Sequence, residues 1–443
     1  MPTNKEQSFD LVIRCGHLLT MTSGAGESPI TDQFIGVRDS KIVSIENWKS
    51  SGWATKEFID ASNKIVMPGL VNGHCHLPMT LFRGLADDLP FEQWLKSYIF
   101  PLEARLVSPE FSKLGAELAI LEALSTGTTT IVDMYYFENS IAETCERGGM
   151  RAILGQTFID FAAPDNKELN GNDWKLLDAL REQFSGHSRI TPALAPHAPY
   201  TVGDETFKKV HQYAAKYKLP ITVHVSETKH EVETSLKQYG KTPLKRLNDL
   251  GVLDTHTIMA HCVHLTDEEM KLASQKWASV VHNPESNMKL GSGAAPIQKL
   301  INAGICVGLG TDGPASNNDL NMFNEMDSAA KLQKLVHEDN TAMTATMALR
   351  MATREGAKAL GLGAQVGTLE IGKLADIIVI DPCVPNMQPM HNILSQLVYA
   401  SSGREVETVI IHGEIVFRDR RATRIDANSV FDRVNHYRSK NKF

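Results

Sequence analysis

Residues 65–76 read IVMPGLVNGHCH, a short apolar run that ends in two histidines one residue apart, His74 and His76. On a β-strand, side chains two positions apart point to the same face, so both imidazoles can reach one metal ion. Imidazole nitrogen suits zinc, and also iron, copper and nickel. An isolated HxH motif is weak evidence for a metal site, because buried structural histidines often form the same motif. The pair gains weight from three similar segments that follow it.

Each of these segments is an apolar, strand-like run with a polar, metal-competent side chain at or near its end. They are residues 219–227 with His224 and Glu227, residues 257–262 with His261, and residues 305–313 with Asp312. Near-continuous apolar runs are typical of strands buried on both faces. Functional groups at the carboxyl ends of several parallel strands are typical of a (β/α)₈ barrel. The sequence therefore predicts an α/β fold built around a (β/α)₈ TIM barrel.

The chain is long enough to hold more than a barrel. Its 443 residues exceed the roughly 250 residues of a typical barrel. Both chain ends show short apolar runs separated by turns, the pattern of strands and hairpins. We expect the two ends to pair into one small β-sandwich domain that the barrel interrupts. The predicted parts are residues 1–67 (first part of the sandwich), 68–366 (catalytic barrel) and 367–443 (second part with a closing helix).

Composition argues against several classes of partner. The formal net charge is -7, from 45 Lys+Arg and 52 Asp+Glu, and no basic cluster stands out, so nucleic acid is not expected as a partner. No apolar run approaches the roughly 18 residues of a membrane span, and the first residues lack the apolar core of a signal peptide. The 6 cysteines form no CxxC pair and are interpreted as reduced thiols. We therefore expect a cytoplasmic protein without a membrane partner.

The chain resembles the amidohydrolase superfamily, in which an HxH motif is followed by two histidines and an aspartate after later strands. The resemblance extends over nearly the whole length. Three longer stretches resemble the branch of 5'-methylthioadenosine/S-adenosylhomocysteine deaminases and s-triazine hydrolases: residues 68–76, 282–293 and 308–318. The resemblance implies a metal-dependent enzyme that hydrolyses a C–N bond of a cyclic amidine.

The expected metal ligands are three neutral imidazoles and one carboxylate: His74, His76, His224 and Asp312. Three protein nitrogens leave a position open for water, as a catalytic zinc site requires. Two-metal members of the superfamily carry a bridging lysine at the end of the fourth strand, and no strand-end lysine occurs there in this chain. We therefore expect one Zn²⁺ per chain, with Fe²⁺ as the alternative metal.

Three residues are expected to carry the chemistry. Asp312 can accept a proton from the attacking water, which the metal activates. Glu227 can hand a proton to a ring nitrogen while the adjacent carbon is attacked. His261 can stabilise the attacking oxygen or the developing charge. A carboxyl proton shuttle beside a metal-activated water is the arrangement of zinc-dependent base deaminases.

The resemblance also implies substrate-binding residues. Glu103 matches the acidic residue that binds the ribose 2'- and 3'-hydroxyls in the nucleoside deaminases, and His197 matches their substrate-contacting histidine. Glu227 and Asp312 would face the substrate as well. Many of those enzymes have an arginine after the strand expected at residues 152–154, where this chain has Gly155-Gln156. We therefore expect a smaller 5'-substituent to fit better than the charged tail of S-adenosylhomocysteine.

The leading hypothesis is a hydrolytic deaminase of an adenosine-type nucleoside, such as 5'-methylthioadenosine or adenosine, that releases ammonia and an inosine-type product. A second hypothesis is an aminohydrolase of another azaheterocycle, such as an s-triazine or guanine. A third is a non-catalytic barrel scaffold, against which the intact set of expected ligands argues. The expected partners are a small-molecule substrate and further copies of the chain in a homo-oligomer.

Overall fold

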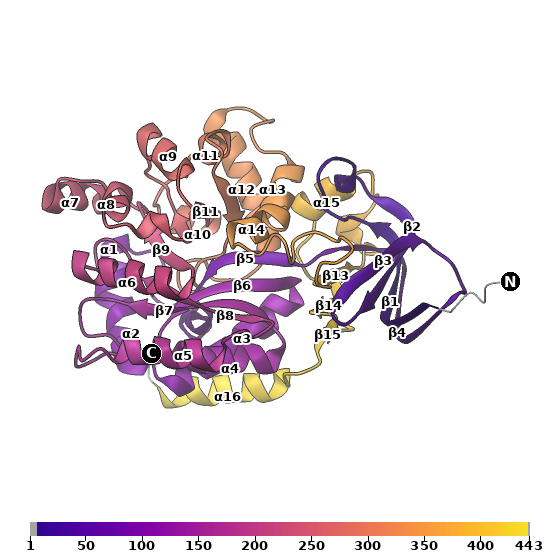
Figure 1. Cartoon of the computed structure of the whole chain (residues 1–443), viewed down its shortest axis with the longest axis horizontal. Coiled ribbons are helices and arrows are strands. Elements are labelled where there is room, and N and C mark those ends of the chain that lie inside the picture. Colours follow the sequence, from indigo (N-terminus) through magenta and orange to yellow (C-terminus); the bar gives the residue numbers. More distant parts are fainter. Residues whose placement is uncertain (1–6, 442–443) are drawn as a thin grey trace.

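In the computed structural model, which describes residues 7–441, a barrel carries a separate sheet on one side (Figure 1). Eight parallel strands follow one another around the barrel in sequence order. They are β5 (Leu70–Cys75), β6 (Thr128–Tyr135), β7 (Arg151–Phe158), β8 (Ile190–Pro196), β9 (Ile221–Val225), β10 (Thr257–His261), β11 (Ala278–His282) and β12 (Cys306–Leu309). The predicted (β/α)₈ class is confirmed.

The barrel closes between its first and last strands just beyond β12. The backbone N–H of Asp312 donates to the carbonyl oxygen of His74 at 2.9 Å, and Cys75 forms a parallel bridge with Asp312. This closing contact brings the HxH motif directly against the residue that follows the last strand.

Helices cover the outside of the barrel. They include α3 (Pro109–Ser125), α4 (Glu138–Gly148), α5 (Asn172–Gln183), α6 (Asp204–Tyr217), α7 (Lys229–Tyr239), α8 (Pro243–Asp249), α9 (Asp267–Ser274), α10 (Pro284–Lys289), α11 (Ile297–Asn302), α12 (Met322–His337), α13 (Ala345–Met351) and α14 (Arg354–Ala359). The start of α3 shows why the sequence pattern predicted it. Ser108 caps the helix by accepting from the N–H of Phe111, and Pro109 occupies the first turn, where its missing N–H costs nothing.

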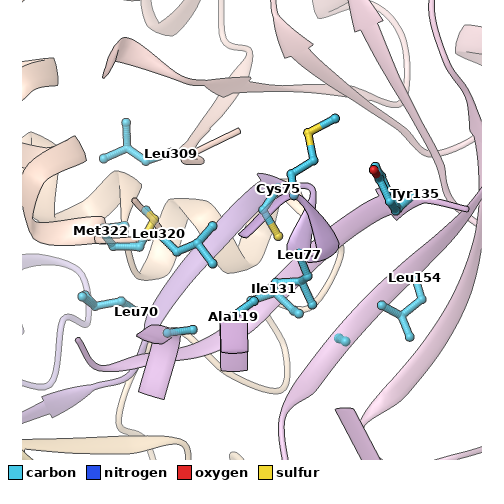
Figure 2. Close-up of a cluster of buried hydrophobic side chains, with 14 of the residues drawn as sticks. Leu70, Cys75, Leu77, Ala119, Ile131, Tyr135, Leu154, Leu309, Leu320 and Met322 are labelled. Atoms are coloured by element: carbon cyan, nitrogen blue, oxygen red, sulfur yellow. The ribbon is translucent and has the colours of Figure 1, made fainter. Parts of the chain in front are cut away.

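A buried apolar layer holds strands and helices together (Figure 2). Leu70 from β5, Ile131 from β6 and Ala119 from α3 are fully buried within it. Leu320, just before α12, and Met322, the first residue of α12, are buried there as well. Close packing of these side chains fixes the strand ends that carry the polar residues.

The two chain ends form a second eight-stranded sheet, as expected. From one edge to the other its strands are β16 (Arg421–Ala422), β15 (Glu414–Arg418), β14 (Val406–Ile411), β13 (Ile377–Ile380), β4 (Trp53–Pro68), β1 (Gln7–Leu18), β2 (Ile30–Arg38) and β3 (Lys41–Asn47). The join between the ends is the antiparallel pair of β13 and β4, in which Ile378 lies opposite Met67. The domain boundaries given above remain predictions.

Two further contacts connect the end segments to the barrel. The closing helix α16 (Ala427–Lys440) lies along α3, where Arg433 pairs with Glu117 at 2.6 Å. The Arg151 side chain at the start of β7 makes two hydrogen bonds to Asp376, of 2.7 and 2.9 Å, and both residues are buried.

A helical segment between β5 and α3 contributes to the walls of the site. It contains the 3₁₀ helix η2 (Leu77–Phe82), the short helix α1 (Phe91–Gln93), the π-helix η3 (Trp94–Ile99) and α2 (Phe100–Leu106). Elsewhere, short 3₁₀ helices lie at Gly24–Glu27, Val252–Asp254 and Pro385–Met387, and α15 spans Ile393–Tyr399. None of the helices within residues 7–441 combines the length and apolar character needed to cross a membrane.

Candidate metal and catalytic site

Three strand ends and the barrel closure bring the four expected ligands together. His74 lies on β5, His76 follows it, His224 lies on β9, and Asp312 follows β12. One donor atom from each residue lies within 4.8 Å of the donor atoms of the others, and all four side chains are buried. Asp312 Oδ1 lies 3.3 Å from His74 Nε2 and 3.0 Å from His76 Nε2.

Backbone carbonyls orient two of the imidazoles. His76 Nδ1 lies 2.6 Å from the carbonyl oxygen of Met134, and His224 Nδ1 lies 2.6 Å from that of His197. Because a carbonyl oxygen only accepts, each Nδ1 must carry a proton, which leaves Nε2 as the ring atom that can bind a metal. Histidines that bind a metal through one ring nitrogen usually donate a hydrogen bond from the other nitrogen in this way.

His74 supplies the observation that tests whether a metal fits. Neither of its buried ring nitrogens has a regular hydrogen-bond partner among the described residues. Burial lowers the pKa of His74 to about 4 and that of His224 well below its ordinary value, so both are neutral donors near pH 7. At His76, Asp312 outweighs burial and raises the pKa of the imidazole. Three imidazole nitrogens and one carboxylate oxygen around a common centre fit a divalent metal such as zinc.

Asp312 is held by its second oxygen. Ser286 and Ser316 donate hydroxyl hydrogen bonds to Oδ2 at 2.6 and 2.7 Å, which leaves Oδ1 facing the histidines. Burial alone would raise the pKa of Asp312, but the close approach of the His74 and His76 rings holds it well below its ordinary value. The residue is therefore a carboxylate that can bind a cation and accept a proton.

Glu227 and His261 lie beside this cluster. The two side chains are buried, with His261 Nε2 3.9 Å from Glu227 Oε2. Ser292 donates to Glu227 Oε1 at 3.3 Å, and Asn287 Oδ1 lies 2.8 Å from His261 Nδ1. Burial raises the pKa of Glu227, against the opposing effect of His261. A carboxyl group with a raised pKa is suited to give and take a proton near neutral pH.

A cavity with two adjoining lobes lies over these residues. The first lobe, with about 410 Å³ of atom-free space, is lined by residues that include Glu227, His261, Asp312 and Trp94. The second, with about 330 Å³, is lined by residues that include Glu103, Tyr135, Tyr136 and Phe100. The lobes share four lining residues: His76, Met79, Leu95 and His197.

Glu103 and His197 thus lie where a substrate could touch both. Glu103 is 3% exposed, and burial raises its pKa to about 7, against the opposing effects of Tyr135 and His76. His197 Nδ1 lies 2.9 Å from the hydroxyl of Thr201, and its ring centre lies 4.9 Å from that of His224. Every site residue expected from the sequence except His74 therefore lines one of the two lobes, and His74 lies in the donor cluster behind them.

The strand expected at residues 152–154 is longer than predicted. Strand β7 does not end at residue 154 but continues to Phe158, so Gly155 and Gln156 lie inside the strand. The Gln156 side chain is buried and donates to Asp165 at 2.7 Å. A Cβ atom on Gly155 would lie 2.8 Å from the Ala195 side chain, so this glycine allows close packing with β8.

Sequence reasoning did not single out the residues that support the site. Ser286, Asn287 and Ser292 belong to the quoted motif at residues 282–293, and Ser316 to that at 308–318. Their presence in those motifs was the available signal. The partners of Ser286, Asn287 and Ser292 are distant in sequence, whereas Ser316 lies four residues after its partner Asp312.

Comparison with known proteins agrees with this geometry. Residues 65–416 match the model of the amidohydrolase family. The chain belongs to the amidohydrolase family. The matched region runs from the end of β4, through the whole barrel, into β15.

Two curated relatives are similar over most of their length. The 5-methylthioadenosine/S-adenosylhomocysteine deaminase of Syntrophobacter fumaroxidans is 43% identical over 378 residues, which cover 85% of this chain and 86% of the relative. The 5'-deoxyadenosine deaminase of Methanocaldococcus jannaschii is 44% identical over 404 residues, with 91% and 95% covered.

Solved structures show the same architecture. The crystal structure of an adenosine deaminase from Xanthomonas campestris, with bound zinc, superposes with a TM-score of 0.94 at 37% identity and covers 98% of this chain and 99% of its own. A triazine hydrolase variant has a TM-score of 0.89 at 23% identity, covers 96% of this chain and 99% of its own, and shows the shared fold.

Proposed function

We propose that this chain is a metal-dependent hydrolytic deaminase of adenosine-type nucleosides, which it converts to inosine-type products and ammonia. The observation that carries the proposal is the two-lobed cavity. One lobe joins the donor cluster to Glu227, and the adjoining lobe holds the buried carboxyl group of Glu103. The names of the similar relatives support the same reaction class.

The proposed metal is one Zn²⁺ per chain, with Fe²⁺ as the alternative, held by His74, His76, His224 and Asp312. The three imidazole nitrogens of the cluster and the zinc bound by the Xanthomonas relative support this choice. When bound, the metal would supply the lowering of the pKa of water that makes a nucleophile available near neutral pH.

The residues of the chain would then move the protons. Asp312 accepts one proton from water as the oxygen attacks the ring carbon that bears the amino group. Glu227 gives its proton to the neighbouring ring nitrogen, so the ring does not accumulate negative charge. His261, whose Nδ1 lies against Asn287, would stabilise the attacking oxygen or the developing charge. Return of the proton from Asp312 to the amino group lets ammonia leave. The proton that remains on the attacking oxygen passes to Glu227 as the carbonyl forms, which restores the Glu227 carboxyl group.

The second lobe would hold the ribose and its 5'-substituent. Glu103 in its ionised form would accept hydrogen bonds from the two ribose hydroxyls, and His197 would contact the sugar or base between the lobes. The lining of this lobe includes aromatic and aliphatic side chains such as Phe100, Ile99 and Tyr136, and no lysine or arginine is among its described lining residues. An uncharged 5'-methylthio or 5'-deoxy group therefore suits it better than a charged amino-acid tail.

Release of ammonia from a substrate panel tests the proposal. The panel would contain 5'-methylthioadenosine, 5'-deoxyadenosine, adenosine, S-adenosylhomocysteine, adenine, guanine and an amino-s-triazine. We expect the highest kcat/KM for an adenosine with an uncharged 5'-substituent. Turnover confined to free bases or triazines would replace the nucleoside by the azaheterocycle hypothesis.

We also propose that the enzyme is cytoplasmic and forms a homo-oligomer. All 6 cysteines are unpaired, which agrees with a reducing compartment such as the cytoplasm. Homo-oligomerisation also remains a proposal, and light scattering of the purified protein would test it.

A further inference from the structure

We propose that Glu231 is a positioning residue, which holds the backbone of Glu227 and thereby places the proton-shuttle carboxyl group over the donor cluster. The inference rests on the proposed function, because it assigns Glu231 a role through the residue that handles the proton. Its geometry can be tested separately, without a substrate.

The Glu231 carboxylate grips two successive backbone groups. Oε1 accepts from the N–H of Ser226 at 2.8 Å, and Oε2 accepts from the N–H of Glu227 at 2.7 Å. All three residues are buried, with Glu231 only 3% exposed. Burial raises the pKa of Glu231 to about 7, against the opposing effect of these two N–H groups, and the ionised form accepts both bonds. Hydrogen bonds to a charged acceptor are roughly twice as strong as neutral ones, and two parallel bonds also fix direction. The carboxylate therefore determines the path of the chain where Glu227 departs from it.

The gripped turn needs such support. Ser226 has a φ of +50°, in the left-handed region that residues with a Cβ adopt at a cost. On its other side, the carbonyl oxygen of Ser226 accepts from the N–H of His264 at 2.9 Å. His264 Nε2 in turn lies 2.7 Å from the carbonyl oxygen of Ser292. The Ser292 hydroxyl donates a hydrogen bond to the Glu227 carboxyl group. Glu231 is thus one of two supports that meet at the Glu227 turn.

Ordinary helix capping does not account for these contacts. Glu231 is the third residue of α7, three positions after the cap residue Thr228, whose hydroxyl oxygen accepts from the Glu231 N–H. Helix α9 has the same spacing in Thr266 and Glu269. There, the Glu269 side chain returns to the N–H of Thr266 itself, at 2.9 Å, and completes a capping box. The Glu231 side chain instead reaches past its own cap to the two residues before it.

This repeat supplies a matched control. Glu231→Gln replaces one accepting oxygen by an NH₂ group, which cannot accept from a backbone N–H. We expect kcat on the best substrate to fall roughly 10²-fold, the size of effect known for a small misplacement of a reacting group. KM and metal content should stay near wild type. Glu269→Gln should lower Tm and leave kcat unchanged.

A double-mutant cycle separates positioning from general stability. If Glu231 acts through Glu227, adding Glu231→Gln to Glu227→Gln should reduce kcat little further, because the group being positioned is already disabled. Full multiplication of the two losses would overturn the proposal. The cycle uses whichever compound the wild type turns over, so a wrong substrate assignment does not decide its outcome.

Hydrogen exchange provides the measurement that needs no substrate. The backbone amides of Ser226 and Glu227 should exchange faster in Glu231→Gln and at the wild-type rate in Glu269→Gln. If Glu231→Gln does not fold, Glu231→Asp keeps the charge, but its shorter side chain cannot reach both N–H groups. A folded Glu231 variant with wild-type exchange or wild-type kcat would overturn the proposal.

Discussion

Glu227 Oε2 and His261 Nε2 lie 3.9 Å apart, although the two residues come from different strand ends of the barrel. Both side chains are buried beside the donor cluster, and each has its own hydrogen-bond partner on the segment that follows β11. The pair can therefore act on one bound molecule from a fixed geometry.

Replacing Glu227 by glutamine should separate metal binding from turnover. The amide preserves the size of the side chain but cannot deliver a proton, and such groups typically contribute about 10²–10⁴-fold to the rate. We expect kcat to fall within that range while metal content stays at the wild-type level. Steady-state kinetics and elemental analysis check the two parts. A variant with near-normal kcat would show that another group shuttles the proton.

Removal of any histidine in the donor cluster should lose metal and activity together. His74→Ala, His76→Ala and His224→Ala each remove one of the three nitrogen donors. Elemental analysis of the wild type should find about one divalent metal per chain. His282→Ala serves as a control, because His282 is also a buried strand-end histidine but is not part of the cluster. Two metals per active chain would contradict the mononuclear site.

Glu103→Gln should weaken discrimination between ribose and deoxyribose. In the wild type, a substrate without the 2'-hydroxyl leaves the buried carboxylate partly unpaired, at a cost of roughly 1–3 kcal/mol. We expect kcat/KM for 2'-deoxyadenosine to be lower than for adenosine by a corresponding factor, and the gap to narrow in the variant. Equal values in the wild type would remove Glu103 from the ribose site.

The same substitution should change how stability depends on pH. Burial raises the pKa of Glu103 from an ordinary value of 4.5 to about 7. The folded protein therefore holds this proton more tightly than the unfolded chain does. Its stabilising contribution is fully present below pH 4.5 and is lost as the pH rises through 7. Relative to wild type, Glu103→Gln should become more stable over this window, as urea unfolding would measure. A difference in the free energy of unfolding between wild type and variant that does not change with pH would contradict the raised pKa of Glu103.

Arg151→Ala should destabilise the fold without touching the site. The substitution leaves Asp376 buried without its cation, and breaking such a pair typically costs about 3–5 kcal/mol. Lys208→Ala, which breaks the exposed pair of Lys208 with Glu205, should leave the free energy of unfolding almost unchanged. Equal effects of the two substitutions in denaturant unfolding would show that burial does not decide the cost.

The sequence allowed the fold and the donor cluster to be predicted because both follow from local patterns. Apolar runs placed the strands, and parallel strands bring their carboxyl ends to one rim. The supports were not visible. Ser286 reaches Asp312 only through tertiary packing, and a serine four residues after Asp312, such as Ser316, does not by itself indicate a hydrogen bond. The end of β7 was misplaced for a related reason: Gly155 resembles a strand terminator, yet it is required by the close approach of β8.

The closing contact between Asp312 and His74 has a consequence for synthesis of the protein. β5 is the first barrel strand to be translated and β12 the last, so the donor set spans almost the whole barrel in sequence. A nascent chain offers imidazoles alone until residue 312 has been made, and contacts between such distant segments form late and slowly. Metal binding should therefore follow closure of the barrel. Chains that terminate before residue 312 would lack both the carboxylate ligand and the contact that joins β5 to the end of β12.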